Sequence, residues 1–287
     1  MIDPATQFLI QAEDIPKQPE DVRRWHGLQG AAFALAIHET ALAENRCILI
    51  IAEHSQSAQR LQQELAFFSG GAYPIDIFPD YETLIYDGFS PHQDILSDRL
   101  ALLSRAALDR AVVIVPAATL LLRLPPRAFL LGHNLRLQTG QRLDLSTLRR
   151  QLHASAYRAV DTVIEHGEFT VRGSVLDLFP MGAAHPFRVE LFDDEIESIR
   201  TFDPETQLST GITDAIDTLP AREFPLSKEG IRLFQDQWHE QFGGNPRDCR
   251  MYQDVAEGQA PAGIEYYLPL FYTETETLLN YLPADLL

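Results

Sequence analysis

The chain has 287 residues, a hydrophobic share of 45% and a net charge of −18. This length is sufficient for two domains, and the composition is typical of a globular protein and excludes a disordered one. The acidic balance opposes non-specific binding to a nucleic-acid backbone. No apolar run reaches the roughly 18 residues that a membrane-spanning helix needs, so we expect no membrane association.

The cysteines and histidines predict neither a disulfide nor a metal site. The two cysteines, Cys47 and Cys249, lie far apart, and Cys47 falls in an apolar run where it suits a small core residue. The nine histidines have no metal-ligand spacing. The acidic N-terminus lacks the basic segment and apolar core of a signal peptide. We therefore expect a cytoplasmic protein without a cofactor.

The first 120 residues alternate helical patterns with apolar runs typical of buried strands. Strands bounded by helices in this order predict a parallel sheet covered on both faces, of the P-loop or Rossmann type. A short helical lead-in is expected at Pro19–Trp25, and Ser55 is a plausible N-cap. The main helices are expected over 31–45, 55–68 and 95–110, and the strands over 47–52, 75–78 and 111–116.

The pattern changes near Leu122, where short alternating runs suit an antiparallel sheet with one wet face. We expect this α+β module to occupy residues 121–207 and to interrupt an α/β domain formed by 1–120 and 208–287. Its strands are predicted over 159–164, 174–179, 187–192 and 197–202, with a polar connection holding Gly167 and Gly173; the helices are predicted over 145–154 and, after the module, 227–242.

Positive charge gathers in the first part of this module. Residues 120–172 contain eight arginines and four acidic residues, a net charge of +4, so the rest of the chain carries −22. Two of the arginines, Arg158 and Arg172, stand at the edges of predicted strands. Either these arginines solvate the surface or they form a module with its own partner, and arginine is the cation most used at interfaces.

The loop before the first helix has the position of a phosphate-binding loop but not its chemistry. Such a loop requires G-x-x-x-x-G-K-[ST], in which the lysine contacts the phosphates and the hydroxyl holds Mg²⁺. Here Gly27 supplies the first glycine and is followed by Gly30, but the later positions hold Ala32, Phe33 and Ala34. We therefore predict a degenerate P-loop layer that does not hydrolyse nucleotides.

Two other polar clusters have structural explanations. The acidic run Asp193, Asp194 and Glu195 lies between two strand patterns, so a hairpin turn is a better explanation than a metal site, whose carboxylates must converge from several elements. Ser90 lies two residues from His92, but no third group is evident to orient a nucleophile. We predict no catalytic residue.

Several long segments resemble known families. The region from Gly27 to about Phe202 resembles the N-terminal part of UvrB, on RGSVLDLFP (172–180) and RVELFDDEIESIRTFDPETQ (188–207). Nearly the whole chain is similar to the N-terminal, UvrB-like region of the bacterial transcription-repair coupling factor (Mfd) family. The stretches that carry this closer resemblance are YETLIYDGFSPHQDILSDRL (81–100), YRAVDTVIEHGE (157–168), LDLFPMG (176–182) and AGIEYYLPLFY (262–272).

The resemblance to the coupling factors implies a docking region without catalysis. In that family the UvrB-like part recruits UvrA through its middle module, and so links a stalled RNA polymerase to nucleotide excision repair. Separate downstream modules of the full-length protein bind RNA polymerase and translocate on DNA with ATP. The degenerate loop, and an Asp80–Leu96 segment too short for UvrB's DNA-inserting hairpin, fit this family. The family motif assigns UvrA contact to Arg158, Arg172, Phe169, Glu165, His166 and Glu168.

Two other functions remain open on the sequence. The α/β layer could still bind a nucleotide as half of a DNA translocase or helicase, in which case ATP would bind despite Phe33. The arginine-rich segment could instead bind DNA phosphates, which would give a steep salt dependence.

Overall fold

The computed structural model describes residues 9–10, 12–17, 21–85, 87–105 and 110–287. The chain forms two compact units. The first unit comprises residues 1–80, 105–122 and 277–287, and the second comprises 81–104 and 123–276. One boundary between the units falls after Leu122. Residues 81–104 and 208–276, however, which we expected in the α/β domain, are grouped with the antiparallel module.

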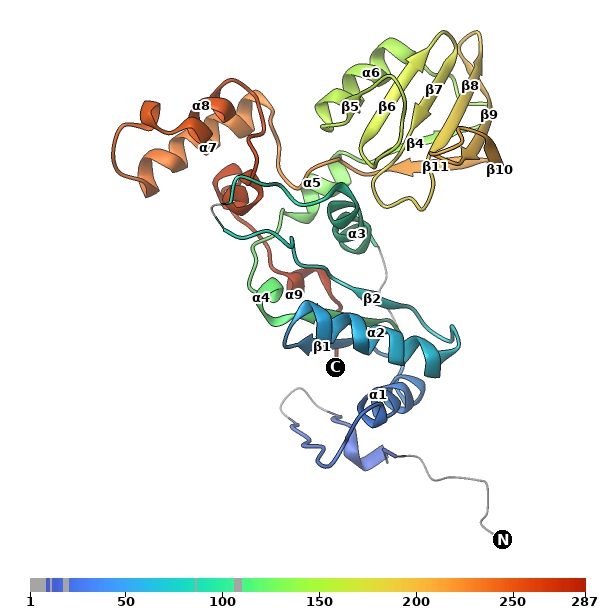
Figure 1. Cartoon of the computed structure of the whole chain (residues 1–287), viewed down its shortest axis with the longest axis vertical. Coiled ribbons are helices and arrows are strands. Elements are labelled where there is room, and N and C mark those ends of the chain that lie inside the picture. Colours follow the sequence, from blue (N-terminus) through green and yellow to red (C-terminus); the bar gives the residue numbers. More distant parts are fainter. Residues whose placement is uncertain (1–8, 11, 18–20, 86, 106–109) are drawn as a thin grey trace. The chain divides into compact units, whose positions relative to one another are not determined.

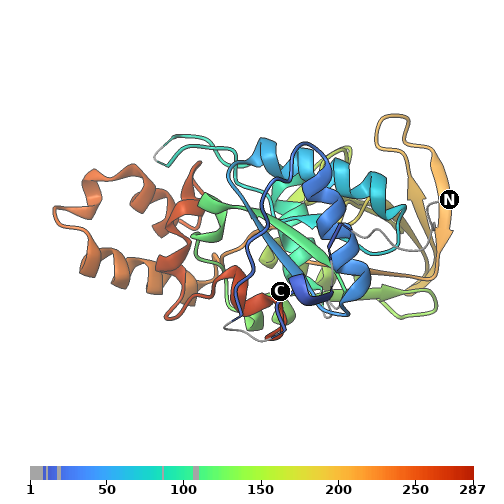
Figure 2. The same ribbon diagram turned by 90° about the horizontal axis from the view of Figure 1, so that it is seen from below.

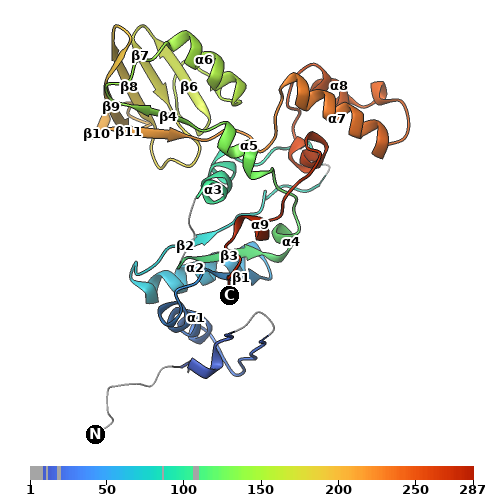
Figure 3. The same cartoon turned by 180° about the vertical axis from the view of Figure 1, so that it is seen from behind.

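The first unit is built on a small parallel sheet. Its strand order is β1-β3-β2 (Figure 3), and β3 is buried along its whole length. The core between strands and helices includes Ile50, Leu65 and Ile114. The elements are η1 (Ala12–Asp14), α1 (Ala32–Ala43), β1 (Ile48–Ala52), α2 (Ser55–Ser69), β2 (Ile75–Ile77), β3 (Val112–Pro116), α4 (Ala117–Leu120) and α9 (Leu278–Tyr281).

Two predictions for the helices of this unit are wrong. Helix α2 begins at Ser55 itself, with His54 at the N-cap and no capping side-chain bond, so the predicted Ser55 cap is wrong. Residues 21–25 are irregular and not the expected helical lead-in, while 18–20 lie outside the described residues. Helix α2 ends at Gly70, whose φ of 54° is the left-handed conformation that glycine adopts without strain.

The second unit is dominated by a six-stranded sheet of order β10-β9-β8-β7-β6-β5, which can be followed in Figure 1. All its pairs are antiparallel except β5 with β6, so the expected antiparallel sheet is confirmed. The sheet continues past residue 207, because β10 pairs with β9. The elements are β4 (Leu135–Gln138), α6 (Leu145–Ala154), β5 (Arg158–Ala159), β6 (Glu168–Arg172), β7 (Val175–Leu178), β8 (Phe187–Phe192), β9 (Glu195–Phe202), β10 (Ser209–Thr213) and β11 (Ala215–Thr218), which pairs with β4.

One predicted strand is wrong. Of the segment 159–164, only Ala159 belongs to a strand, and the residues after it form a loop, whereas β6 lies in the segment expected to be a polar connection. The reason is tertiary packing. Val160 and Val163 pack with Phe179 and Phe202 in a small cluster. Their apolar side chains therefore belong to a loop that packs against the sheet. The mixed α/β class is confirmed.

The rest of the second unit is helical. Helices α7 and α8 lie side by side and appear in orange in Figure 2. Phe234, Trp238 and Phe271 pack at their core. Among the described residues no helix is both long and apolar enough to cross a membrane. The elements are α3 (Gln93–Ser104), α5 (Arg127–Gly132), α7 (Lys228–Gln241), η2 (Pro246–Asp248), α8 (Arg250–Ala256) and η3 (Ile264–Phe271).

Candidate protein-docking face

The register of the six-stranded sheet places four arginines on one face. Residues paired across strands point to the same side of a sheet, and side chains alternate along each strand. Arg158 pairs with Glu168, two positions before Thr170, which pairs with Asp177. Asp177 in turn pairs with Arg188, and Arg188 with Arg200. We call this side of the sheet the arginine face; its arginines are Arg158, Arg172, Arg188 and Arg200.

The opposite face is apolar and buried. It carries Phe169, Leu176, Val189 and Ile199, each with no exposed surface. The Phe169 ring meets the His153 ring of α6 edge-on, with the ring centroids 5.2 Å apart. Phe169 therefore belongs to the core of the module, and its burial contradicts the expected contact with a partner. Its role is to hold β6 against α6.

A single buried carboxylate anchors two arginines at the centre of the arginine face. The Arg188 guanidinium donates to both Asp177 oxygens, Nε to Oδ1 at 2.7 Å and Nη2 to Oδ2 at 3.0 Å. Arg172 Nη2 donates to the same Oδ2 at 2.8 Å. The Asp177 side chain is 1% exposed whereas that of Arg172 is 58% exposed. The acid thus lies beneath the surface and the positive charge is presented above it.

A second ion pair, between Arg200 and Glu190, lies on the same face. The Glu190 carboxylate accepts from Ser198 Oγ at 2.9 Å and lies 3.3 Å from Arg200 Nη2. Arg188 also places its guanidinium carbon 5.0 Å from the centre of the Phe202 ring, within cation–π range. These contacts restrict the arginine rotamers before any partner binds, which lowers the entropic cost of association.

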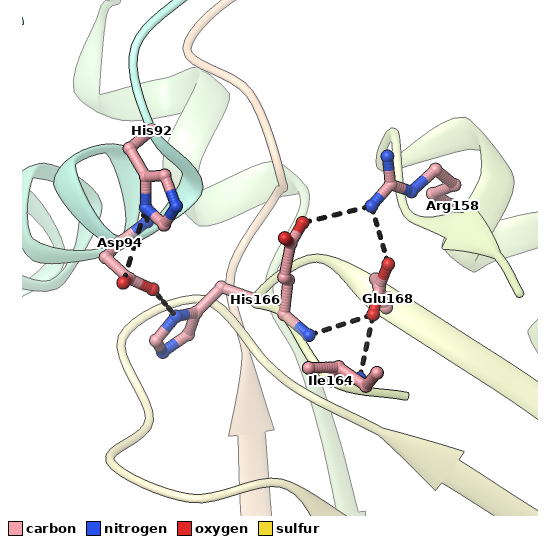
Figure 4. Close-up of polar contacts among 7 residues, drawn as sticks. His92, Asp94, Arg158, Ile164, His166 and Glu168 are labelled. Carbon is pink, nitrogen blue, oxygen red and sulfur yellow. Dashed lines mark hydrogen bonds and ion pairs between the residues drawn. The ribbon is translucent and has the colours of Figure 1, made fainter. Parts of the chain in front are cut away.

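At the end of the face, Arg158 is held by two glutamates (Figure 4). Its Nη2 atom lies 2.5 Å from Glu168 Oε1 and 3.1 Å from Glu165 Oε2. Glu168 also accepts from the backbone N–H groups of Ile164 and Glu165, both at 2.8 Å. Burial raises the pKa of Glu168, but these N–H donors and Arg158 together hold the pKa below its ordinary value. Glu168 is therefore a buried anchor, and Arg158 and Glu165 are the exposed groups.

His166 fixes the loop between β5 and β6 to helix α3. Its Nδ1 lies 2.7 Å from Asp94 Oδ1 (Figure 4), and its Nε2 lies 2.8 Å from the Ala183 carbonyl oxygen. Its ring also packs on Phe179, with centroids 3.9 Å apart. Because both ring nitrogens already have partners and the side chain is only 14% exposed, His166 orients this loop.

The arginine face contains two arginines that the sequence did not single out, Arg188 and Arg200. Both lie in segments correctly predicted as strands, and the alternation in FRVELF already placed Arg188 opposite its apolar neighbours. The strand pairing, which determines the shared face, could not be read from one sequence.

The remaining candidates do not converge on this face. Gly27 and Gly30 adopt positive φ before α1, and no strand precedes them in the described stretch 21–26. Ala32 opens that helix, Ala34 is buried, and Phe33 is partly exposed. No side chain at these positions can contact a phosphate or Mg²⁺ in the manner of a phosphate-binding loop.

The acidic run forms the predicted hairpin turn, whereas Ser90 bonds to a distant glutamate. Asp193 and Asp194 form the turn between β8 and β9, with Asp193 at a φ of 54°. No group of metal-ligating side chains occurs within the described part of the chain. Ser90 Oγ donates to Glu265 at 3.0 Å and so is committed to a structural bond.

The part of the chain that carries this face matches a known domain. Residues 135–224 match the sequence model of the UvrB interaction domain family. This range runs from β4 past β11 and contains all four arginines of the arginine face.

Similarity to whole proteins extends along the chain. The transcription-repair-coupling factors of Haemophilus influenzae and Escherichia coli are each 44% identical to it, over 276 and 275 residues, or 96% and 95% of this chain and 24% of each relative. That of Bacillus subtilis is 26% identical over 278 residues, or 91% of this chain and 23% of the relative. The predicted resemblance to the transcription-repair coupling factor family is thus confirmed, and the chain spans about a quarter of the length of these relatives.

Proposed function

We propose that this chain is the UvrA-docking region of a transcription-repair coupling factor, through which a stalled RNA polymerase is linked to nucleotide excision repair. The observation that supports this most is the arginine face within the matched domain. Two of its exposed guanidinium groups are anchored by buried carboxylates, Arg158 by Glu168 and Arg172 by Asp177. Arginines held in this way suit bidentate pairing with carboxylates of a protein partner.

The charge balance favours a protein partner over DNA. Each arginine of the face has an acidic partner within 3.3 Å, so little uncompensated charge remains to neutralise phosphates. The chain as a whole carries −18. Affinity for DNA depends mainly on the number of phosphates that are neutralised, whereas a protein interface uses geometry and partial desolvation as well.

We assign no nucleotide hydrolysis to this chain. Phe33 and Ala34 stand where a phosphate-binding loop carries its lysine and hydroxyl. DNA translocation with ATP and contact with RNA polymerase belong, in this proposal, to other parts of the full-length protein.

Binding to UvrA and to duplex DNA should be measured side by side with the same preparation. We expect saturable binding to purified UvrA at about micromolar concentration or tighter, and no saturable binding to a DNA duplex near physiological salt. Tight DNA binding that weakens steeply with salt, together with no UvrA binding, would contradict the proposal.

A further inference from the structure

The second unit contains a cavity on which the docking proposal does not depend. It lies where the end of α5, the end of α6 and the segment leading into α7 meet. Its polar lining includes Arg222, Lys228, His133 and His153. None of the described residues that line it is acidic, although acidic residues outnumber basic ones in the whole chain.

Arg222 is the residue whose surroundings suggest a bound ligand. Within the described part of the chain its guanidinium has no hydrogen bond and no ion pair, while Glu265 acts on it only at longer range. Burial lowers the pKa of Arg222, and the charge of Glu265 offsets part of this effect. An arginine stays charged in proteins, and a half-buried cation without a counter-ion is costly. An anion in the cavity would remove that cost.

Donors and apolar walls complete the cavity. His133 Nδ1 donates to the Phe129 carbonyl oxygen at 2.8 Å, since a carbonyl can only accept, and this bond fixes the ring at the cavity wall. Ser227 Oγ accepts from the Gly230 N–H, and its hydroxyl is hydrogen-bonded to Glu229, so this side chain caps α7 at the edge of the cavity. The first turn of α7 adds a small positive potential, though Glu229 opposes it. The apolar lining consists mainly of Phe129, Phe224, Leu226, Pro220 and Pro225.

We propose that this cavity binds a small phosphate ester. Arg222 and Lys228 would engage the phosphoryl oxygens, and Phe129 and Phe224 would contact the organic group. An arginine fork matches two phosphate oxygens, and a nearby lysine adds a second positive charge for a dianion. A carboxylate carries a single negative charge, so its attraction to these two cations would be weaker. The inference is independent of UvrA docking.

The test is a calorimetric titration of the 287-residue chain with phenyl phosphate, at constant ionic strength. We expect saturable binding, weaker binding of inorganic phosphate because it lacks the aromatic group, and weaker binding of phenylacetate because it carries one charge. Arg222→Gln should weaken phenyl phosphate binding about tenfold or more, and Lys228→Gln should weaken it several-fold. The matched control is Arg232→Gln on α7, whose side chain is 85% exposed; it should leave affinity unchanged.

Three results would overturn the inference: no saturable binding of phenyl phosphate, equal affinity in the Arg222→Gln chain, or equal affinity for phenylacetate. Circular dichroism checks that each variant is folded. If Arg222→Gln fails to fold, Lys228→Gln decides, because Lys228 is exposed and its replacement leaves the core intact. Unchanged binding in a folded Lys228→Gln chain would then count against the site.

Discussion

At the residue scale, the geometry of the arginine face depends on two acids that lie beneath it. Asp177 and Glu168 are almost fully buried, and each holds an arginine whose guanidinium remains open to solvent. Removing either acid would leave the arginine in place but free to change rotamer. The acids are therefore positioning residues for the docking surface.

Glu168 also makes the stability of the module dependent on pH. Its pKa in the folded state lies below the ordinary value of 4.5 because backbone donors and Arg158 more than offset burial. The stability that it contributes is complete above the unfolded-state pKa and is lost as the pH falls through the folded-state pKa. In urea unfolding between about pH 6 and pH 3, wild type should lose more stability than Glu168→Gln.

The matched control for this measurement is Glu165→Gln, because the Glu165 side chain is about half exposed and also contacts Arg158. It should follow the wild-type pH profile closely. Parallel profiles for wild type and Glu168→Gln would show that the charge of Glu168 contributes nothing to folding.

At the scale of elements, the regular patterns were predictable and the loop over the sheet was not. Helix α6 and strand β8 have the predicted bounds, because each has a clear apolar period and polar neighbours. The apolar pattern of Val160 and Val163 predicts a strand after β5, yet these side chains lie in a loop, where they pack against Phe179 and Phe202. The sequence likewise indicates arginines at strand ends, but it does not show which of them share a face of the sheet, because that depends on the strand pairing.

Gly167 tests how tightly that loop is fixed. It has a φ of +78°, and an added Cβ would lie 3.3 Å from the Cβ of Ala221. Gly173, in the turn between β6 and β7, has a φ of +61° but nothing within 4 Å. Gly167→Ala should cost roughly 1–3 kcal/mol in urea unfolding, and Gly173→Ala should cost less because only backbone strain is added. Equal costs would show that the loop relaxes freely away from Ala221.

At the scale of the whole chain, positive charge is concentrated in one segment, and most of its arginines lie outside the arginine face. Residues 120–172 are basic within a chain of net charge −18. Repulsion from the acidic remainder would discourage binding of nucleic acid, whereas the positioned arginines of the sheet offer hydrogen-bonding geometry to carboxylates of a protein partner. In the proposed docking function, the first unit, with Phe33 in place of a phosphate-loop lysine, would serve as scaffold.

Calorimetric titration of UvrA with wild type, Arg158→Ala and Arg172→Ala tests the docking proposal most directly. Each variant should lose roughly 1–4 kcal/mol of binding free energy, or about fivefold to a thousandfold in affinity, while its unfolding midpoint stays near that of wild type. The control is Arg232→Ala, an exposed arginine of α7 outside the arginine face, which should bind as wild type does. Wild-type affinity in both face variants would contradict the assignment of the arginine face as the docking site.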